Sequence, residues 1–384
     1  MKRIITTARE NWQKKVEDIG FIFHHTVEGL YWDESAYYTF DCRQAAILEK
    51  ATNQLYKMCL RSAEYIIDNK MYSKLGIPEP FIPFIENCWH SRQPSVYGRF
   101  DLRYDGIYPP KLLEFNADTP TSLFEASIVQ WFWLREVYPK CDQFNSIHEK
   151  LIKRWKYLKK QYYGATLYFA CLKDNPEDLV NTEYIHDCAM QAGLNTRFIY
   201  VEDIGYDENT GAFVDMDGRP IQNIFKLYPW EWMVREEFGP KLITSYKTTN
   251  WTEPPWKMLL SNKGILPILW QLFPNHENLL PAYFEDDVKA GQMDSYVKKP
   301  KLSREGANIA IYSGNDMIAE SGGDYGEEGY IYQAFSPLPE FDGFHPVIGS
   351  WLVGYHPAGI GIRESDSLIT GNLSRFVPHL ISTT

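Results

Sequence analysis

The chain has 384 residues, of which 44% are hydrophobic and 23% charged, so it fits a folded protein with room for several hydrophobic cores and is too apolar to be disordered. Its 39 basic and 50 acidic residues give a net charge of −11, which argues against nucleic acid as a main partner because the chain would repel a phosphate backbone. No signal-peptide core opens the sequence and no apolar run is long enough to cross a bilayer, so we expect a cytoplasmic protein without a membrane partner.

The first regular pattern in the chain is an apolar stripe at residues 45–72. Its apolar side chains recur every three or four residues, which predicts an amphipathic helix packed on a core. The next pattern, at 97–118, alternates polar and apolar residues on both sides of a turn that contains Asp105-Gly106 and Pro109-Pro110. This alternation predicts a β-hairpin.

Helical and strand-like patterns alternate in the middle of the chain. A helical segment at 151–162 is followed by a strand at 166–171, a helix at 177–193 and a strand at 197–201. The last three segments predict a βαβ unit, and therefore some parallel sheet.

Short strand-like runs separated by glycine and aspartate turns fill the last part of the chain. They lie at 295–300, 307–312, 329–335, 347–354 and 359–363. We expect them to form one mainly antiparallel sheet with helices on one side, which makes this part an α+β lobe.

The predicted hairpin carries polar and charged side chains two positions apart. Arg99 and Asp101 share one face of the first strand, and Glu114 and Asn116 share one face of the second. If these faces coincide, two carboxylates and an amide oxygen meet beside a cation, and this set of oxygen donors suits Mg²⁺. The alternative is an ordinary cross-strand salt bridge.

A basic strand end that runs into a loop of small residues, at 296–308, forms a second cluster. Lys299 offers a point charge, Arg304 a guanidinium fork, and the glycine that follows allows close approach to the backbone, as a triphosphate requires; a solvated turn is the alternative. Lys263 is a further candidate phosphate contact, or else a lysine at a helix start. Gln333 could read an adenine edge. The sequence contains no Walker A, GxGxxG, GxSxG or HExxH motif.

Six ordered motifs give a more specific indication. They are Tyr-Gly-Arg-Phe-Asp (97–101), Leu-Leu-Glu-Phe-Asn-Ala-Asp-Thr-Pro-Thr-Ser (112–122), Phe-Lys-Leu-Tyr-Pro-Trp-Glu (225–231), Leu-Ser-Asn-Lys-Gly-Ile-Leu-Pro (260–267), Lys-Pro-x-x-Ser-Arg-Glu-Gly (299–306) and Gly-Ile-Gly-Ile-Arg-Glu (359–364). Together they resemble the glutathionylspermidine synthase family, and most closely its short bacterial members, described as acid–amine ligases.

The resemblance covers nearly the whole chain and has consequences for the fold. It implies a mixed α+β and α/β protein with an ATP-grasp fold, in which two α+β subdomains hold a nucleotide, preceded by a βαβ-containing lobe like a pre-ATP-grasp domain. We therefore expect one catalytic unit over 1–384. Its approximate lobes are 1–165 with the hairpin, 166–245 with the βαβ unit, and 246–384 with the nucleotide-binding region.

The resemblance also assigns roles to residues of the hairpin and of the basic loop. It implies that Asp101, Glu114 and Asn116 are Mg²⁺ ligands and that Arg99 meets the transferred phosphoryl group. Arg304 matches the arginine of a mobile loop over the reacting carboxylate. We expect loss of Glu114 to abolish turnover and to relieve repulsion from Asp101 in the metal-free protein.

Further residues match nucleotide and substrate positions of the family. Lys263 and Lys299 resemble the lysines that contact the nucleotide phosphates, Arg363 matches another phosphate-side arginine, and Gln333 falls in the adenine pocket. Thr119 and Thr121 stand where the bifunctional enzymes have serines near the peptide substrate, so this chain keeps hydroxyl groups there but need not use glutathione.

The implied reaction uses ATP and Mg²⁺ and joins a small-molecule acid to a small-molecule amine. ATP phosphorylates a carboxylate, and an amine attacks the acyl phosphate to form an amide. A glutathione-like peptide and a polyamine are the candidate substrates. A phosphotransferase and a non-catalytic ATP-grasp binding protein remain alternatives. The amidase domain of the bifunctional enzymes has no counterpart in the sequence, so we expect no hydrolysis of the product; the oligomeric state stays open.

Overall fold

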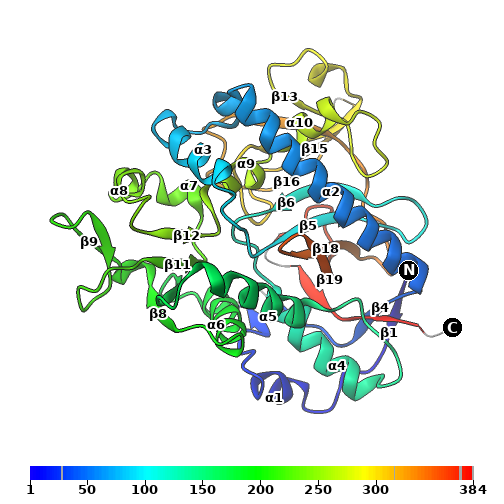
Figure 1. Ribbon diagram of the computed structural model, residues 1–384. Helices are drawn as coiled ribbons and strands as arrows, with labels where there is room; N and C mark the ends of the chain where they lie inside the picture. Colours follow the sequence, from blue (N-terminus) through cyan, green and yellow to red (C-terminus); the bar gives the residue numbers. More distant parts are fainter. Residues whose placement is uncertain (27–28, 315, 372–373, 383–384) are drawn as a thin grey trace.

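The computed structural model describes residues 1–26, 29–314, 316–371 and 374–382. In this part of the chain the strands form four sheets of three or more strands and two short hairpins, with helices packed around them (Figure 1). The protein therefore has a mixed α/β fold. None of the helices in these ranges combines the length and the apolar character that a bilayer crossing requires.

A five-stranded antiparallel sheet, which we call the central sheet, contains the predicted hairpin. In spatial order its strands are β20 (Arg375–Val377), β19 (His356–Ser365), β18 (His345–Val353), β5 (Tyr97–Arg103) and β6 (Lys111–Asn116). The prediction of a hairpin is confirmed. The prediction of a single C-terminal sheet is wrong, because β18 pairs with β5 on one side instead of with the strands that precede it in sequence.

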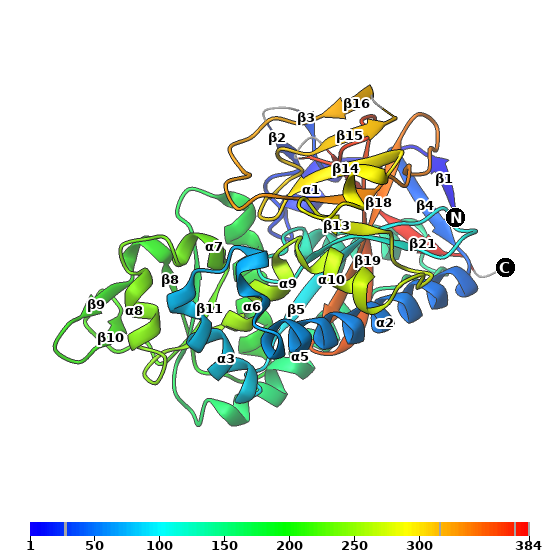
Figure 2. The same cartoon turned by 90° about the horizontal axis from the view of Figure 1, so that it is seen from above.

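A second five-stranded antiparallel sheet, the outer sheet, lies over the central one (Figure 2). In order its strands are β13 (Ala282–Phe284), β17 (Tyr330–Ala334), β14 (Ser295–Pro300), β15 (Ala310–Ser313) and β16 (Asp316–Glu320). Strand β15 begins three residues later than predicted, because Glu305, Gly306 and Asn308 adopt positive φ angles that interrupt an extended chain.

The predicted βαβ unit is confirmed in a four-stranded parallel sheet. In order its strands are β12 (Asn250–Thr252), β11 (Asn223–Lys226), β7 (Leu167–Cys171) and β8 (Thr196–Tyr200). Helix α6 (Pro176–Gln191) connects β7 to β8 and packs against α5 (Ile147–Leu158). The hairpin of β9 (Gly205–Asp207) and β10 (Ala212–Val214) extends from this region (Figure 1).

The longest helix, α2 (Cys42–Asp68), lies along the central sheet and contacts β18 and β19. It starts three residues before the predicted stripe because Asp41 and Gln44 form a capping box. It ends at Asp68, with Asn69 as its C-cap, before Lys70 turns to positive φ. The other helices surround the sheets: α1 (Trp12–Glu17), α3 (Ile82–His90), α4 (Gln130–Val137), α7 (Trp230–Met233), α8 (Gly239–Thr244), α9 (Met258–Ser261) and α10 (Ile265–Leu272).

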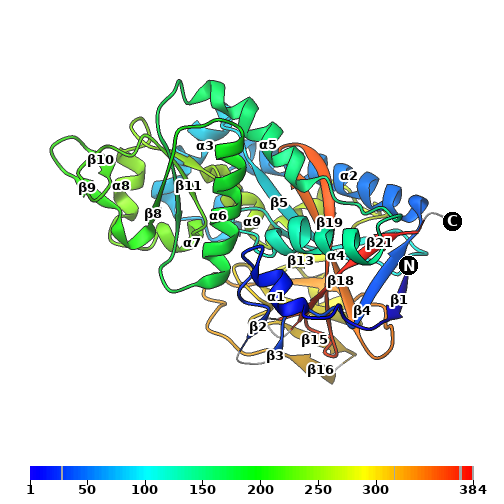
Figure 3. The same cartoon turned by 90° about the horizontal axis from the view of Figure 1, so that it is seen from below.

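Segments from both ends of the described chain meet in a three-stranded sheet (Figure 3). Strand β4 (Ala36–Phe40) pairs antiparallel with β1 (Lys2–Ile5) and parallel with β21 (His379–Ile381). A short hairpin of β2 (His25–Thr26) and β3 (Gly29–Leu30) precedes β4. The last strands of the chain thus complete two sheets: β21 completes this one, and β18 to β20 complete the central sheet.

Candidate active site

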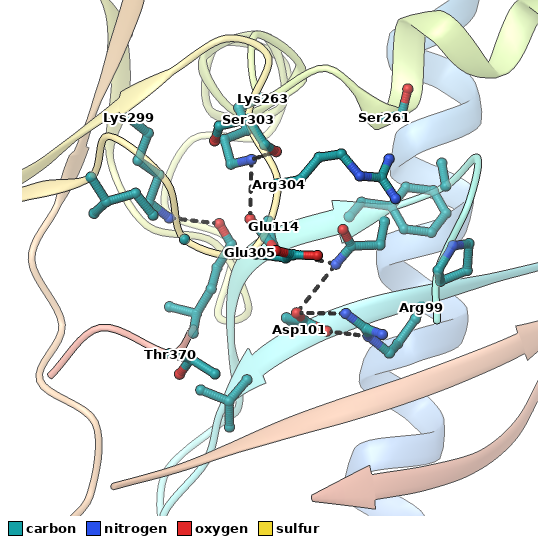
Figure 4. A pocket seen from close by; sticks show the side chains of 18 of the residues that line it. Arg99, Asp101, Glu114, Ser261, Lys263, Lys299, Ser303, Arg304, Glu305 and Thr370 are labelled. Atoms are coloured by element: carbon teal, nitrogen blue, oxygen red, sulfur yellow. Dashed lines mark hydrogen bonds and ion pairs between the residues drawn. The ribbon is translucent and has the colours of Figure 1, made fainter. Parts of the chain in front are cut away.

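A cleft lies between the central sheet, the outer sheet and the N-terminal end of α6, and encloses about 250 Å³. This volume approaches the range of small-molecule sites, which starts near ~300 Å³. The structure brings the eleven site residues predicted from the sequence to the wall of this one cleft: Arg99, Asp101, Glu114, Asn116, Thr119, Thr121, Lys263, Lys299, Arg304, Gln333 and Arg363. Figure 4 labels six of them, which are Arg99, Asp101, Glu114, Lys263, Lys299 and Arg304.

The hairpin positions a compact polar cluster on its cleft face. In the antiparallel register Arg99 is opposite Asn116 and Asp101 is opposite Glu114, so the two faces coincide. Asn116 Nδ2 lies 3.2 Å from Asp101 Oδ2 and 3.1 Å from Glu114 Oε1. Asp101 also accepts hydrogen bonds from Arg99 Nε at 2.7 Å and from Arg363 Nη2 at 2.9 Å. Arg99 and Asp101 thus form an ion pair within one strand, and no ion pair in the described ranges joins β5 to β6 across the hairpin.

Two lysines face Glu114 from the other wall. Lys263 Nζ is 3.3 Å from Glu114 Oε2 and donates to the Ser303 carbonyl at 2.8 Å. Lys299 Nζ donates to Leu113 O at 2.9 Å, in the same strand as Glu114. Burial by itself would raise the pKa of Glu114, but the charges of Lys263 and Lys299 outweigh it and hold that pKa well below its usual range. The carboxylate is ionised.

Gln333 lies beneath Lys299 and is buried. Its Oε1 accepts from Lys299 Nζ at 2.7 Å, and its Nε2 donates to the Leu112 carbonyl at 3.0 Å. Burial lowers the pKa of Lys299 to about 8. Gln333 thus fixes the lysine in this structure, and its contact with adenine stays a prediction.

Arg304, from the loop between β14 and β15, reaches across the cleft to a threonine. Its Nη1 donates to Thr119 Oγ1 at 2.8 Å, and its guanidinium lies 5.6 Å from the ring of Trp232. Two residues farther on, the Thr121 carbonyl accepts from Arg99 Nη1 at 2.6 Å. The segment 119–122 therefore contacts both arginines that the sequence singled out for chemistry.

Three carboxylates that sequence reasoning missed line the cleft beside Arg304: Glu177, Asp178 and Glu231, here called the acidic wall. Glu231 Oε1 is 3.8 Å from Arg304 Nη1. Burial raises the pKa of all three, and together with the charge of Glu177 it raises the pKa of Asp178 to about 7. Glu177 and Asp178 lie in the first turn of α6, where acidic residues usually only complement the helix dipole, so their position in the sequence did not indicate a site. Glu231 could have been found, because it is the last residue of the Phe-Lys-Leu-Tyr-Pro-Trp-Glu motif.

A buried ion pair between Lys226 and Asp118 positions the part of the acidic wall that contains Glu231. Lys226 Nζ, at the end of β11, is 2.6 Å from Asp118 Oδ1, and Asp118 Oδ2 accepts from the backbone of Trp230 at 2.9 Å. Asp118 follows β6 closely in sequence, so the pair ties the hairpin to the start of α7, where Glu231 lies. Removal of either partner would leave an unpaired buried charge.

The polar cluster of the hairpin fits a magnesium ion by the chemistry of its donors. Asp101 and Glu114 supply carboxylate oxygens and Asn116 an amide oxygen, which are hard donors on a rigid sheet. No group of three or more His, Cys, Asp or Glu side chains in the described ranges is arranged to hold a metal ion. A set of two carboxylates and one amide leaves several coordination positions to water and phosphate oxygens, as is usual for Mg²⁺.

Comparison with known proteins places the chain in a family. The family model described as glutathionylspermidine synthase preATP-grasp matches residues 3–382. The chain is 41% identical to a Haemophilus influenzae protein named "Putative acid–amine ligase", over 99% of both chains. It is 30% identical to trypanothione synthetase of Crithidia fasciculata and 28% identical to the bifunctional glutathionylspermidine synthetase/amidase of Escherichia coli, over 82% and 91% of this chain but only 52% and 60% of those longer proteins.

A solved structure shares the fold at low sequence identity. It is the glutathione synthetase-like effector GSS30 of Globodera pallida, with a TM-score of 0.56 at 14% identity, over 90% of this chain and 89% of that one. The chain therefore belongs to the glutathionylspermidine synthase preATP-grasp family and is an ATP-dependent carbon–nitrogen ligase.

Proposed function

We propose that this ligase joins the carboxylate of a small peptide to an amino group of a polyamine, on an ATP-grasp architecture that binds Mg·ATP between the central and the outer sheet. One observation carries the proposal: the cleft combines a cationic region around Glu114 with an acidic wall beside Arg304. The first suits a triphosphate and the second a cationic amine. The names of the longer relatives, trypanothione synthetase and glutathionylspermidine synthetase, support peptide and polyamine substrates.

The hairpin and the two lysines would form the nucleotide side. Asp101, Glu114 and Asn116 would hold Mg²⁺, which would neutralise phosphate charge when bound. Lys263 and Lys299 lie on the same side of the cleft within reach of Glu114, and both donate hydrogen bonds that a phosphate oxygen could accept instead of a carbonyl. Arg363, which pairs with Asp101, would contact the same phosphates.

The reaction proceeds in two transfers. A carboxylate oxygen of the acid attacks the terminal phosphorus of ATP, the bond to the bridging oxygen breaks, and ADP and an acyl phosphate form. The amine nitrogen then attacks the acyl carbon, the carbon–oxygen bond to phosphate breaks, and an amide and phosphate result. Arg99 and Arg304, both held by segment 119–122, would stabilise the charge on the moving phosphoryl group and on the reacting carboxylate.

The acidic wall would bind the amine and take its proton. A polyamine enters as a cation, which Glu177, Asp178 and Glu231 attract, but only its unprotonated amino group can attack. Asp178, with a pKa of about 7, is suited to accept that proton and to release it at neutral pH. A phosphotransferase would have no use for such a wall, and a non-catalytic protein would gain nothing from burying it.

The test is a screen for ADP release with ATP and Mg²⁺ over a matrix of small peptides and amines, with mass spectrometry of the products. We expect ADP release that requires both an acid and a polyamine and rises with pH through the neutral range. Glu231→Gln should raise the KM for the polyamine more than the KM for ATP. Glu277→Gln, which removes an exposed carboxylate paired with Lys50 at 3.8 Å, serves as control. Amine-independent phosphorylation of an alcohol, or turnover only with simple amino acids, would contradict the proposal.

A further inference from the structure

Ser122, the last residue of segment 119–122, forms a second polar cluster with Tyr31 and Glu125. None of these three residues lines the cleft. The Tyr31 hydroxyl is 2.7 Å from Glu125 Oε1 and 3.1 Å from Ser122 Oγ. Glu125 is completely buried. Its Oε2 has no hydrogen-bond partner, and no ion pair joins Glu125 to a cation in the described part of the chain.

This cluster is costly for the fold. A buried carboxyl group without a cation is unfavourable in its charged form. Ser122 adopts a φ of 65°, a left-handed conformation that is rare for residues other than glycine. Glu125 begins a π-helical turn, Glu125–Val129, inside an otherwise α-helical segment, and such turns are frequent at functional sites. Strain of these kinds persists where the surroundings enforce it, often next to reacting groups.

The cluster is directly linked to the candidate active site through the backbone. Ser122 follows Thr121, whose carbonyl accepts the 2.6 Å hydrogen bond from Arg99. The next residue, Leu123, donates its backbone N–H to Asn181 Oδ1 on α6 at 2.9 Å, and so ties the same turn to the helix that carries Glu177. The left-handed turn at Ser122 thus sets the direction in which the Thr121 carbonyl points.

We propose that Glu125 is a positioning residue that stays protonated and, through the Tyr31 hydroxyl, locks Ser122 so that the Thr121 carbonyl orients Arg99. A neutral carboxyl group offers Tyr31 a carbonyl acceptor without placing a second negative charge behind Glu177. The charged or titratable groups that face it are Tyr31, Glu177 on α6 and Arg99 on β5. Burial and the charge of Glu177 raise the pKa of Glu125 to about 8, in agreement with a neutral group at neutral pH.

The role proposed for Arg99 rests on the proposed function, so the test combines kinetic and structural measurements. Tyr31→Phe removes the hydroxyl that joins Glu125 to Ser122. Glu125→Gln keeps an acceptor for Tyr31 but cannot ionise. Thr52→Val is the matched control, because Thr52 Oγ1 forms a buried hydroxyl pair with Ser350 Oγ at 2.6 Å, between α2 and β18 and away from the cleft.

We expect Tyr31→Phe to lower kcat of amine-dependent ADP release by about ten- to a hundredfold, with little change in the KM for ATP, because a displaced catalytic arginine loses transition-state contacts. Glu125→Gln should retain kcat at pH 7. It should also reduce the decline of kcat above about pH 8, where the wild-type carboxyl group loses its proton, and leave the part of the decline that comes from Lys299, whose pKa is also about 8. Thr52→Val should lower the melting temperature without changing kcat. A wild-type kcat in Tyr31→Phe, together with a wild-type pH profile of kcat in Glu125→Gln, would overturn the inference.

Two measurements test the cluster independently of turnover. Hydrogen exchange of residues 119–123 should be faster in Tyr31→Phe than in the wild type and unchanged in Thr52→Val. At pH 7 the infrared carbonyl band of protonated carboxylic acids, to which Asp178 also contributes, should lose intensity in Glu125→Gln. If no acid and amine support ADP release by the wild type, the proposed function fails. An unchanged exchange rate in Tyr31→Phe, or a carbonyl band of unchanged intensity in Glu125→Gln, then overturns the present inference separately.

Discussion

At the scale of single residues, Glu114 shows how neighbouring charges decide what a carboxylate does. The sequence led us to expect repulsion between Glu114 and Asp101. The structure makes this expectation wrong, because the Asn116 amide lies between the two carboxylates, and Lys263 and Lys299 face Glu114. In the ligand-free protein Glu114 is therefore stabilising.

We predict that Glu114→Gln abolishes turnover and also lowers the melting temperature of the ligand-free protein. The pKa of Glu114 is lowered in the folded state, so its contribution to stability is fully present above the unfolded pKa, about 4.5, and is lost progressively as the pH falls from there toward the lower folded-state pKa. Thermal unfolding from pH 3 to 7 should show the two proteins converging at the acidic end. An unchanged or higher melting temperature at pH 7 would restore the view that repulsion dominates. The exposed variant Glu277→Gln should change neither quantity.

His379, which does not line the cleft, provides a second test of charge burial. It is completely buried, its Nδ1 pairs with Gln130 Oε1 at 2.8 Å, and burial lowers its pKa to about 3. Below pH 6.5 the unfolded chain binds a proton there that the folded chain does not. Stability should fall as the pH drops toward 3, by up to about 1.4 kcal/mol per pH unit from this group. His379→Asn keeps a donor for Gln130 and should reduce that slope in urea unfolding; equal slopes would show that His379 is protonated in the folded protein.

At the scale of elements, the loop between β14 and β15 depends on one glycine. Gly306 has a φ of +73°, and a Cβ atom there would lie 2.5 Å from the Thr370 carbonyl oxygen. We predict that Gly306→Ala displaces the loop and lowers kcat, because Arg304 lies two residues away and bonds Thr119 across the cleft. Gly314→Ala is the control, since Gly314 also has a positive φ but nothing within 4 Å of its would-be Cβ. Similar kinetics for the two variants would show that the Arg304 contact does not depend on this turn.

The elements found from the sequence were those with local signals. Alternation identified the hairpin, and the distances between its side chains then followed from the register of two adjacent strands. The pairing of β5 with β18 left no local signal, because the two strands lie far apart in the chain and either could pair elsewhere with the same pattern. Glu177 and Asp178 were missed for a related reason: their role depends on where α6 points. The chemical roles of the eleven predicted cleft residues remain predictions.

At the scale of the whole molecule, the site is assembled from segments spread over the chain. Arg99, Glu231, Lys263, Arg304 and Arg363 line one cleft although they come from all three expected lobes. Each lobe boundary therefore separates parts of one site. Sequence motifs located the contributors, and the folded sheets determine their arrangement.

We predict that residues 246–384 do not fold as a separate fragment, because β18 would expose the edge that β5 covers in the central sheet. The fragment should give a poorly dispersed proton–nitrogen NMR spectrum, and addition of residues 1–245 should restore dispersion. A well-dispersed spectrum for the fragment alone would show an autonomous domain and support the lobe boundary at residue 246.

The position of β5 between β6 and β18 also sets the order of events during synthesis. Strand β5 leaves the ribosome long before β18, and at roughly 5–20 residues per second the delay is on the order of tens of seconds. During that interval its apolar residues Tyr97, Phe100 and Leu102, all buried in the finished protein, lack one of their two neighbouring strands. The central sheet therefore closes only once residues 345–353 have emerged, and until then the growing chain presents an open strand edge that is free to pair with another chain.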